Sequence, residues 1–444
     1  MNRRASGFDD AAVPESLSGR ALRPGDRGYS RYTSSYLRSG APGLVLRPQN
    51  PEQTRDAVRL ARSHRDVPLG IYSAGHGLSG RSLNVGGLVI DVSAINRVEP
   101  LGGHRVRIGP GARWIDVSRV LTPLGLAISS GDYGGVGVGG LATAGGVGWF
   151  AREHGLTIDH LRSVDIVTAD GNLLHASADE HSDLFWGMRG AGANFGVAVS
   201  FEFEARPVGQ VGFAQLTFTT SDVASFLQRW GAAVEASDRS VSATMLVGGT
   251  RRGQPVQVMA SVVVDADQPD LIIERLQPIL KVARVVDQSV ALASYDQVIG
   301  AFFQEGSGQH GQGEPHAHSA LVRHLDEETS AMIAALLESG ASHFFTVRSV
   351  GGAVADTPAD ATAYGWRDAN FSLVAVGSPR SGLDQWWARL LPSVEGMYLS
   401  FESDTGPEVL SRAFPPAHLA RLRTLKRRYD PTGLFRDNFY IAPE

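Results

Sequence analysis

The chain has 444 residues, of which 43% are hydrophobic and 20% charged, which excludes a disordered or fibrous protein and leaves room for two or three domains. Its formal net charge is −5 and it has no block of Lys or Arg, so we expect no nucleic-acid partner. The lack of Cys excludes disulfides, thiolate nucleophiles and Cys-ligated metals. No apolar run is long enough for a membrane span or a signal peptide, so we expect a soluble, cytoplasmic protein that does not bind membranes.

The first half of the chain alternates between strand and helix signals. Residues 1–40 are polar and rich in Arg and Ser, which predicts a weakly ordered lead-in. Apolar residues recur at helical spacing over 51–64 and predict a helix there. The run 165–177 is typical of two strands joined by an Asp-Gly turn, and 196–205 is typical of a strand with one solvated face. Three further short strands are predicted at 68–71, 86–93 and 104–111, and one more helix at 114–125.

The composition changes near Pro207, beyond which polar connections are longer. Strand-like and helical runs alternate up to about residue 400, and this mixture predicts a second, α+β domain. The chain closes with an amphipathic helix that starts near His418 and ends at Asp430-Pro431. The strand-like runs include 242–249, 256–264 and 344–352, and the helical stretches include 270–283 and 329–339.

Three Gly-rich runs are the candidates for ligand binding. SAGHGLSG (73–80) follows a predicted strand, so its backbone N–H groups can approach an anion closely, although a tight turn with an incidental His has the same pattern. GDYGGVGVGGLATAGGVGW (131–149) indicates close backbone packing or a flat ligand, because Gly inside an element costs about 0.5–1 kcal/mol relative to Ala. DLFWGMRGAGANFGV (183–197) has GxGxxxG spacing and no acidic ribose partner, which argues against a Rossmann domain.

These three runs, together with YDPTGLFRDN (429–438), occur in an order that resembles the berberine bridge enzyme-like flavoproteins of the vanillyl-alcohol oxidase superfamily. The resemblance implies an α+β fold in which a PCMH-type FAD-binding domain of two α/β subdomains meets a substrate domain with an antiparallel sheet flanked by helices. We expect the FAD-binding domain at 1–206 (core 40–206) and the substrate domain at 207–399. The C-terminal segment 400–444 is expected to return to the FAD-binding domain.

The resemblance also implies an FAD attached covalently through His76. Many members add a second bond from a Cys, but Tyr133 stands at that position here, so His76 is the single expected attachment point. Three positions near the flavin in relatives depart from the usual residues, namely Tyr72, His160 and the closing run 438–440. Val136 occupies the position that controls oxygen access, and Val there resembles the oxygen-reactive members.

The residues expected around the cofactor belong to the motifs just described. They are Ser73, Ala74, Gly75, His76, Gly77, Ser79, Gly80, Gly131, Asp132, Val136, Gly137, Gly139, Gly140, Thr143, Gly146, Gly148, Asn194, Gly196, Val197, Asn438 and Tyr440.

The chemistry implied by the family is hydride removal from a C–O or C–N centre of a small organic metabolite, with O2 as acceptor and H2O2 as product. Tyr398 is the first candidate for the base that takes the proton, with Tyr133 and Tyr72 as alternates; a phenol needs cationic or hydrogen-bonding help for this role. A dehydrogenase with another acceptor, or a flavin-bearing cyclase or binding scaffold without net redox turnover, are the competing hypotheses. The substrate class is left open, with a preference for a secondary metabolite or an alkaloid-like amine over a sugar.

A cluster of three histidines raises the question of a metal site. His310, His316 and His318 lie in the biased run 306–318, but their spacing and the scarcity of nearby carboxylates are poor for a metal ligand set. We therefore expect no metal, and a solvated or substrate-edge loop at this run.

Overall fold

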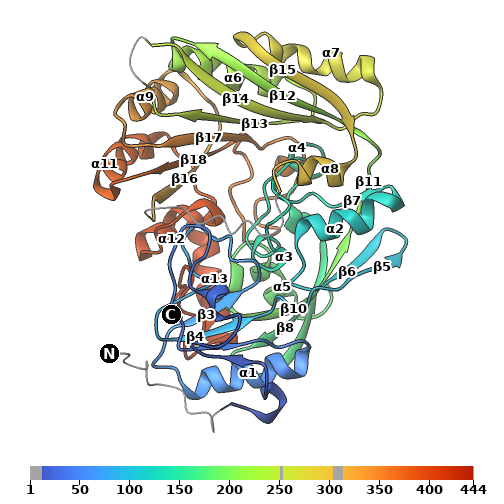
Figure 1. Ribbon diagram of the computed structural model, residues 1–444, viewed down its shortest axis with the longest axis vertical. Helices are drawn as coiled ribbons and strands as arrows, with labels where there is room; N and C mark the ends of the chain where they lie inside the picture. The colour runs from blue at the N-terminus through green and yellow to red at the C-terminus, as the bar shows by residue number, and fades with distance from the viewer. Residues whose placement is uncertain (1–12, 251–253, 304–313, 444) are drawn as a thin grey trace.

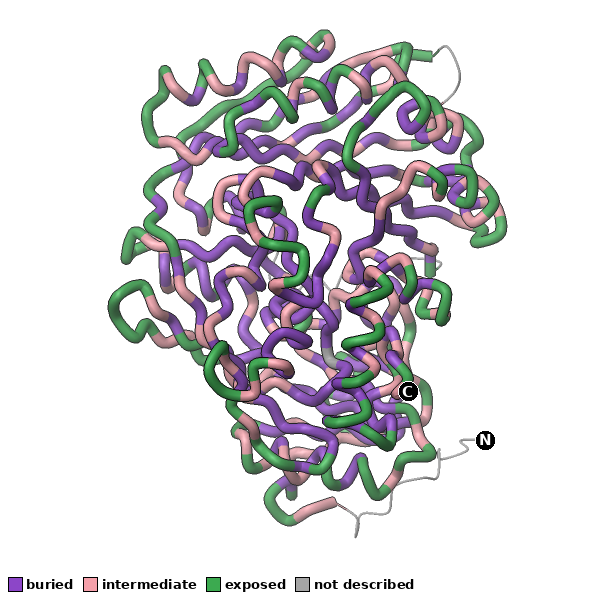
Figure 2. The backbone as a smooth tube through the Cα atoms, turned by 180° about the vertical axis from the view of Figure 1, so that it is seen from behind, coloured by how far each residue is buried: buried purple, intermediate pink, exposed green. Residues whose placement is uncertain are grey.

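The structure is a computed structural model, and it describes residues 13–250, 254–303 and 314–443. Three sheets dominate it, two in the first half of the chain and one in the second (Figure 1). This confirms the α+β class. Buried segments run through the interior of the molecule, and exposed segments lie mainly in the outer helices and loops (Figure 2).

The first sheet has four strands in the order β1-β2-β4-β3, with β2, β3 and β4 parallel and β1 antiparallel. Helix α1 (Pro51–Ser63) begins at Asn50, whose side chain accepts a hydrogen bond from the Gln53 N–H, and its apolar side packs on the sheet. The strands are β1 (Ala21–Leu22), β2 (Leu44–Leu46), β3 (Leu69–Tyr72) and β4 (Leu88–Asp91).

The expectation of a weakly ordered lead-in is wrong for residues 13–40. This segment contributes β1 to the sheet, and Tyr29 and Tyr32 are buried against it. The Tyr32 hydroxyl donates to the buried Asp91 carboxylate over 2.5 Å. Aromatic residues interspersed in a polar segment supply the anchors that its average composition conceals.

The second sheet is antiparallel, in the order β5-β6-β10-β8-β9. Trp114 of α2, Phe201 and Phe203 belong to its core, and α2 (Trp114–Leu121) and α5 (Ser182–Met188) contribute buried residues to the same cluster. The strands are β5 (Val98–Gly102), β6 (Arg105–Ile108), β8 (Leu161–Thr168), β9 (Leu173–Ser177) and β10 (Gly196–Glu204). The short strands β7 (Leu126–Ala127) and β11 (Arg206–Pro207) pair separately.

The third sheet has seven antiparallel strands in the order β15-β12-β14-β13-β17-β18-β16, all inside the predicted 207–399 segment. Its helices pack on the face turned away from the rest of the molecule (Figure 1). The strands are β12 (Val211–Thr220), β13 (Val241–Gly248), β14 (Val256–Val264), β15 (Arg284–Ala293), β16 (His316–Val322), β17 (Phe344–Ser349) and β18 (Phe371–Gly377). The helices are α6 (Val223–Ala236), α7 (Pro269–Leu280), α9 (Glu327–Glu338) and α11 (Arg380–Leu390).

The C-terminal segment returns to the first half of the chain, where α13 (Pro416–Tyr429) packs beside α5. The fully buried Lys426 fixes it there, because its Nζ donates to the Asn194 carbonyl, the Asp430 carboxylate and the Phe435 carbonyl. The shorter elements of the second half are α8 (Tyr295–Gly300), α10 (Ala353–Asp356), η8 (Leu399–Phe401) and α12 (Pro407–Ala413). Within the described ranges, no helix combines the length and the hydropathy that a bilayer span requires.

Candidate active site

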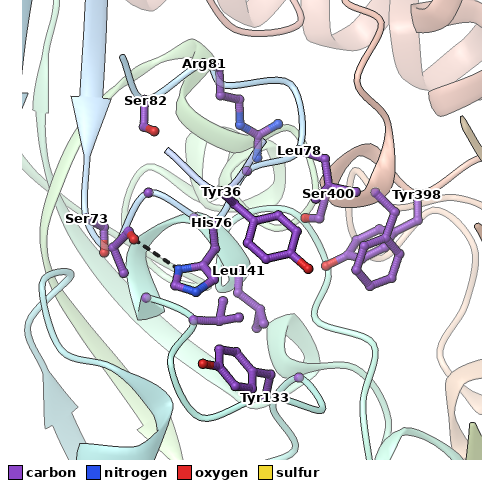
Figure 3. A pocket seen from close by; sticks show the side chains of 18 of the residues that line it. Tyr36, Ser73, His76, Leu78, Arg81, Ser82, Tyr133, Leu141, Tyr398 and Ser400 are labelled. Atoms are coloured by element: carbon purple, nitrogen blue, oxygen red, sulfur yellow. Dashed lines mark hydrogen bonds between the residues drawn. The ribbon is translucent and has the colours of Figure 1, made fainter. Parts of the chain in front are cut away.

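A cavity of about 890 Å³ lies between the Gly-rich segments of the first half and the open face of the seven-stranded sheet. Its size is within the range of small-molecule and cofactor sites. Figure 3 shows its central part, with His76, Tyr36 and Tyr133 on one side and Tyr398 and Ser400 on the other. Of the residues predicted to bind the cofactor or act in catalysis, those that line it are Ser73, Ala74, Gly75, His76, Gly77, Gly131, Asp132, Tyr133, Val136, Gly137, Gly139, Gly140, Thr143, Gly196, Val197, Tyr398 and Asn438.

His76 lies in the loop that follows β3, and its ring is flanked by two tyrosines. The Tyr36 ring stacks on it at 5.8 Å and the Tyr133 ring lies at 5.7 Å. Its Nδ1 is 3.0 Å from the Ala74 carbonyl oxygen, so in the neutral ring Nδ1–H donates there and Nε2 keeps a free lone pair. Burial lowers the pKa of His76, and nearby Arg113 lowers it further. The ring is therefore neutral, and nucleophilic, at pH 7.

The glycines of 131–149 have two distinct roles. A Cβ at Gly140 would meet no atom within 4 Å, so this backbone faces open cavity. By contrast, a Cβ at Gly148 would lie 1.9 Å from the Ser130 carbonyl oxygen, and one at Gly146 would lie 2.0 Å from the Thr157 hydroxyl. The latter two glycines allow segments to pack closely, and they do not line the cavity.

Seven predicted residues do not line the cavity: Tyr72, Ser79, Gly80, Gly146, Gly148, Asn194 and Tyr440. Tyr72 packs edge-on against Tyr32 behind Gly75, which separates its hydroxyl from the cavity and removes its access as a base. Asn194 is buried, and its side chain bonds the Ala191 carbonyl and the Ile441 N–H. His160, expected near the flavin, is also buried away from the cavity.

Tyr398 places its hydroxyl in the cavity wall, where the Gly146 N–H donates to it over 2.9 Å. Burial raises the pKa of this phenol, while the Ser400 side chain, the Gly146 N–H and the charge of Arg81 partly offset the rise. The resting side chain is therefore a protonated phenol whose anion has hydrogen-bonding and cationic support. This is the assistance that a tyrosine base requires.

The opposite wall consists of side chains from the seven-stranded sheet. Arg348 is its charged member; its Nε donates to the Asp132 carboxylate over 2.7 Å, and its guanidinium lies 4.4 Å from the centre of the Phe401 ring. The Arg348–Asp132 ion pair joins the sheet to the Gly-rich segment across the cavity. The apolar side chains of this wall are Leu246, Met259, Phe344, Val374 and Val376.

Among the cavity residues that sequence reasoning missed, Tyr36 and Arg81 lie beside the His76 loop. Tyr36 comes from the segment expected to be weakly ordered, and its N–H donates to the Gly75 carbonyl. Arg81 follows the SAGHGLSG run, and burial lowers its pKa to about 10. Its guanidinium lies over the Phe439 ring at 5.1 Å, and no carboxylate of the described residues pairs with it. A basic residue directly after a Gly-rich loop was a usable signal for Arg81, whereas Tyr36 had none.

The residues of the cavity fit an FAD. Backbone N–H groups of residues 75–79 donate to no described residue, which leaves a row of donors for an anionic diphosphate. The buried Ser82 Oγ and Asn438 Oδ1 likewise have no partner among the described residues, and both residues line the cavity. Arg81 adds an uncompensated positive charge.

The histidine-rich run 306–318 was predicted to be a solvated or substrate-edge loop, and its described end differs from that prediction. Part of it, including His310, lies outside the described residues, while His316 and His318 begin strand β16 and His318 is buried. A solvated loop is therefore wrong for this end of the run. Within the described part of the chain, no group of three or more potential ligands could hold a metal ion.

Comparison with known proteins supports the cofactor. A family model described as an FAD binding domain matches residues 42–177. The chain is 28% identical to (R)-6-hydroxynicotine oxidase of Paenarthrobacter nicotinovorans over 98% of both chains. The fold is similar to that of 6-hydroxy-D-nicotine oxidase from Arthrobacter nicotinovorans, with a TM-score of 0.83, 24% identity and coverage of 98% of this chain and 100% of that one. It is also similar to glucooligosaccharide oxidase from Acremonium strictum, which carries a 6-S-cysteinyl, 8α-N1-histidyl FAD, with a TM-score of 0.84, 21% identity and coverage of 98% and 99%.

Proposed function

Because the chain belongs to the FAD-linked oxidoreductases of the vanillyl-alcohol oxidase and PCMH family, we propose that it oxidises a small organic molecule at a C–O or C–N centre and passes the electrons to O2, giving H2O2. The observation that carries this proposal is a single cavity that the FAD motifs and the seven-stranded sheet line together, with the Tyr398 hydroxyl in its wall. Bound FAD supplies the two-electron acceptor. Val136, which lines the cavity at the position associated with oxygen access, supports O2 as the final acceptor.

The chain's own groups would bind, orient and deprotonate the substrate. Tyr398 would first lose its own proton, and the Gly146 N–H and Arg81 stabilise the phenolate. The phenolate would then take the proton from the donor hydroxyl or amine and return to the phenol. Tyr133 also lines the cavity, but it lies beside His76 and packs near Phe303. We assign it a lining role.

Anaerobic reduction followed by exposure to air tests the reaction class. We expect a donor to bleach the flavin absorbance, and air to restore it within seconds with one H2O2 released per flavin. Reoxidation that takes many minutes would indicate a dehydrogenase with another acceptor. Product formation without any flavin bleaching would indicate a scaffold without net redox turnover.

The cofactor attachment proposed is a single covalent bond between His76 and FAD. A neutral, partly buried imidazole with a free ring nitrogen is a competent nucleophile, and no Cys is present to form a second bond. Acid precipitation should leave the yellow colour in the protein pellet, and intact mass should include one flavin. His76→Ala should release all flavin into the supernatant, while His64→Ala, a change at a histidine outside the cavity, should not.

The substrate class proposed is an amine or alcohol with an apolar skeleton, because aliphatic and aromatic side chains of the sheet wall, among them Leu246, Met259 and Phe344, would pack against it. The one charged pair of this wall, Arg348–Asp132, is already internally neutralised. A sugar would instead need several polar partners for its hydroxyls. Peroxide release from a panel of hydrophobic amines and alcohols, compared with oligosaccharides at equal concentration, tests this assignment.

A further inference from the structure

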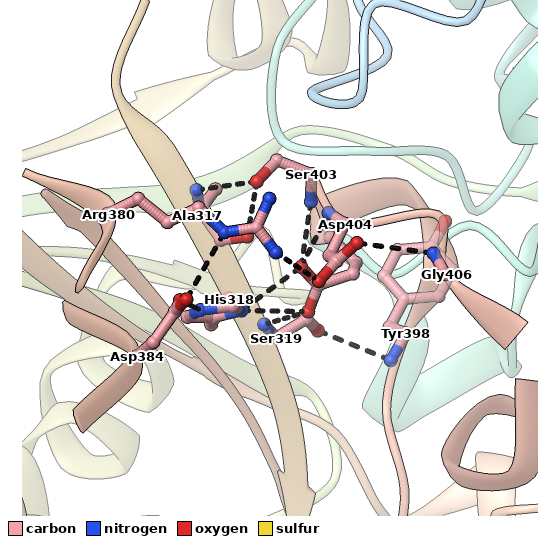
Figure 4. A network of polar contacts seen from close by, with 10 residues as sticks. Ala317, His318, Ser319, Arg380, Asp384, Tyr398, Ser403, Asp404 and Gly406 are labelled. Atoms are coloured by element: carbon pink, nitrogen blue, oxygen red, sulfur yellow. Dashed lines mark hydrogen bonds and ion pairs between the residues drawn. The ribbon is translucent and has the colours of Figure 1, made fainter. Parts of the chain in front are cut away.

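Alternating charges run from Arg380 through Asp384 and His318 to the buried Glu402, and Figure 4 labels the first three of these residues. Arg380 joins Asp404 and Asp384, with nitrogen–oxygen distances of 2.6 and 3.2 Å. His318 then joins Asp384 through Nε2 at 2.7 Å and Glu402 through Nδ1 at 3.1 Å. The Glu402 side chain is fully buried, whereas that of Asp384 is 41% exposed. We refer to these five residues, Arg380, Asp404, Asp384, His318 and Glu402, as the charge network.

The geometry of His318 requires its charged form. A carboxylate faces each ring nitrogen, so both nitrogens must donate, and a neutral ring would leave one lone pair against a carboxylate oxygen. Burial alone would lower the pKa of His318, but the hydrogen bonds and charges of Glu402 and Asp384 outweigh burial and raise it above its usual value. The imidazolium therefore supplies the counter-charge that the buried Glu402 needs.

Glu402 in turn holds the segment that carries the proposed base. Its carboxylate accepts hydrogen bonds from the N–H groups of Ser319, Ser403 and Asp404, at 3.2, 3.0 and 2.9 Å. The Ser319 hydroxyl accepts from the Tyr398 N–H over 3.2 Å. The single-turn helix η8 lies between Tyr398 and Glu402. The charge network therefore holds both of its ends, one directly at Glu402 and the other through Ser319 at Tyr398.

We propose that His318 is a positioning residue that, through Glu402 and Ser319, holds Tyr398 and Ser400 at the reacting side of the cavity. This inference rests on the proposed function of Tyr398 as the proton acceptor. The charged and titratable groups packed around His318 are Glu402 and Asp404 from the segment after η8, Asp384 and Arg380 from α11, and His316 from its own strand. The Trp387 ring of α11 stacks on the imidazole at 5.5 Å and completes its surroundings.

The charge network predicts that turnover falls at alkaline pH, because His318 then loses its proton. His318 is protonated below its raised pKa, so its contacts to Glu402 and Asp384 are complete below that value and are lost as the pH rises through it. Above it, Glu402 has no counter-charge, and η8 loses the contact that fixes its C-terminal end. The cofactor motifs lie elsewhere on the cavity wall, so FAD content should not change.

The direct test is His318→Gln in the FAD-loaded enzyme. We expect kcat to fall about 10- to 100-fold, the size of effect that misplacement of a reacting group produces, with unchanged flavin content and loss of the alkaline limb of the wild-type pH profile. His324→Gln is the matched control, because His324 pairs with Glu235 at 3.1 Å on the exposed surface. A wild-type kcat and pH profile in His318→Gln would overturn the proposal.

A milder variant keeps the test decisive if His318→Gln does not fold. Asp384→Asn removes one charge from His318 but leaves a hydrogen-bonding side chain, so the alkaline limb should move to lower pH. An unshifted limb would contradict positioning by the imidazolium. A purely structural role for Asp384 would reduce folded protein without moving the limb.

A measurement without turnover separates this inference from the proposed function. In protein labelled with 4-fluorophenylalanine, the 19F resonance of Phe401, which lies in η8 and packs on the Tyr398 ring, is assigned by its loss in Phe401→Leu. It should titrate with pH in the wild type but not in His318→Gln. If it does so while no donor reduces the flavin, the positioning stands and the proposed oxidase function fails. If it does not titrate in the wild type, the positioning fails regardless of activity.

Discussion

The two walls of the cavity are built in different ways. The wall formed by residues 73–80 and 131–149 presents much of its backbone, because six of its cavity-lining positions are glycines, and Gly140 leaves open space for a flat ligand. The wall formed by the seven-stranded sheet presents side chains from alternating positions of β13, β14, β17 and β18. A backbone wall suits a cofactor of fixed shape, whereas a side-chain wall can change with each substrate.

The largest expected effect belongs to the backbone wall and its packing. Gly148→Ala would place a Cβ 1.9 Å from the Ser130 carbonyl oxygen, and neither backbone can move without displacing the segment beside the cavity. We expect essentially no folded, flavin-containing protein, measured by soluble yield and near-UV circular dichroism. Gly209→Ala, at an exposed position with no atom within 4 Å of the new Cβ, should express normally. Normal flavin loading in Gly148→Ala would show that this wall tolerates side chains after all.

The next effect concerns the group that lies where the two walls meet. Tyr398→Phe should lower kcat by about 10²–10⁴-fold, the usual contribution of a positioned acid or base, with little change in KM. It should also cost about 1–3 kcal/mol of stability, because the buried Gly146 N–H loses its acceptor. Stopped-flow flavin reduction measures the first effect and thermal unfolding the second. Tyr133→Phe is the control, and an equal loss of kcat in both variants would remove Tyr398 from its assigned role.

The same contrast explains what the sequence could predict. Gly148 and His76 belong to runs whose glycines indicate close packing or a ligand, and the FAD cofactor and the PCMH-type α+β fold followed from the family resemblance that these runs carry. The sheet wall could not be predicted, because whether Leu246 or Met245 faces the cavity depends on register and on which strands become neighbours. The order of the seven strands is set by contacts far apart in the chain, and β12 and β15 were not predicted at all. The cofactor-binding roles of individual residues, and the boundaries at 206 and 399, stay predictions.

Tyr36 and His318 show a second limit of the sequence. Both lie in segments whose average composition indicates solvent exposure, yet Tyr36 lines the cavity and His318 is buried between two carboxylates. Each depends on partners that are distant in the chain, and a single sequence does not reveal such pairings.

A moderate effect is expected at the side-chain wall. Leu246 is half-buried and lines the cavity, so Leu246→Ala removes contact with substrate at little cost to the fold. We expect KM for the best substrate to rise about tenfold, near the lower limit for lost apolar contact in a pocket, while the flavin spectrum stays unchanged. Leu124→Ala, at a 53% exposed leucine outside the cavity, is the matched control. A change in flavin loading without a change in KM would reverse the roles of the two walls.

The smallest effect is expected at the open part of the backbone wall, where a substitution should change FAD binding and leave KM unchanged. A Cβ at Gly140 would meet no protein atom, so Gly140→Ala should fold as the wild type does, but its methyl group would occupy space facing the cofactor. Covalent attachment would conceal a change in affinity, so the variant is best made together with His76→Ala, which leaves the flavin exchangeable. We expect the dissociation constant for FAD to rise several-fold relative to His76→Ala alone, measured by fluorescence quenching. Gly209→Ala in the same background controls for the added methyl group. We propose that this wall contacts the cofactor and not the substrate, so Gly140→Ala in the covalently loaded enzyme should leave KM unchanged. A KM shift as large as that of Leu246→Ala would mean that substrate also touches the backbone wall.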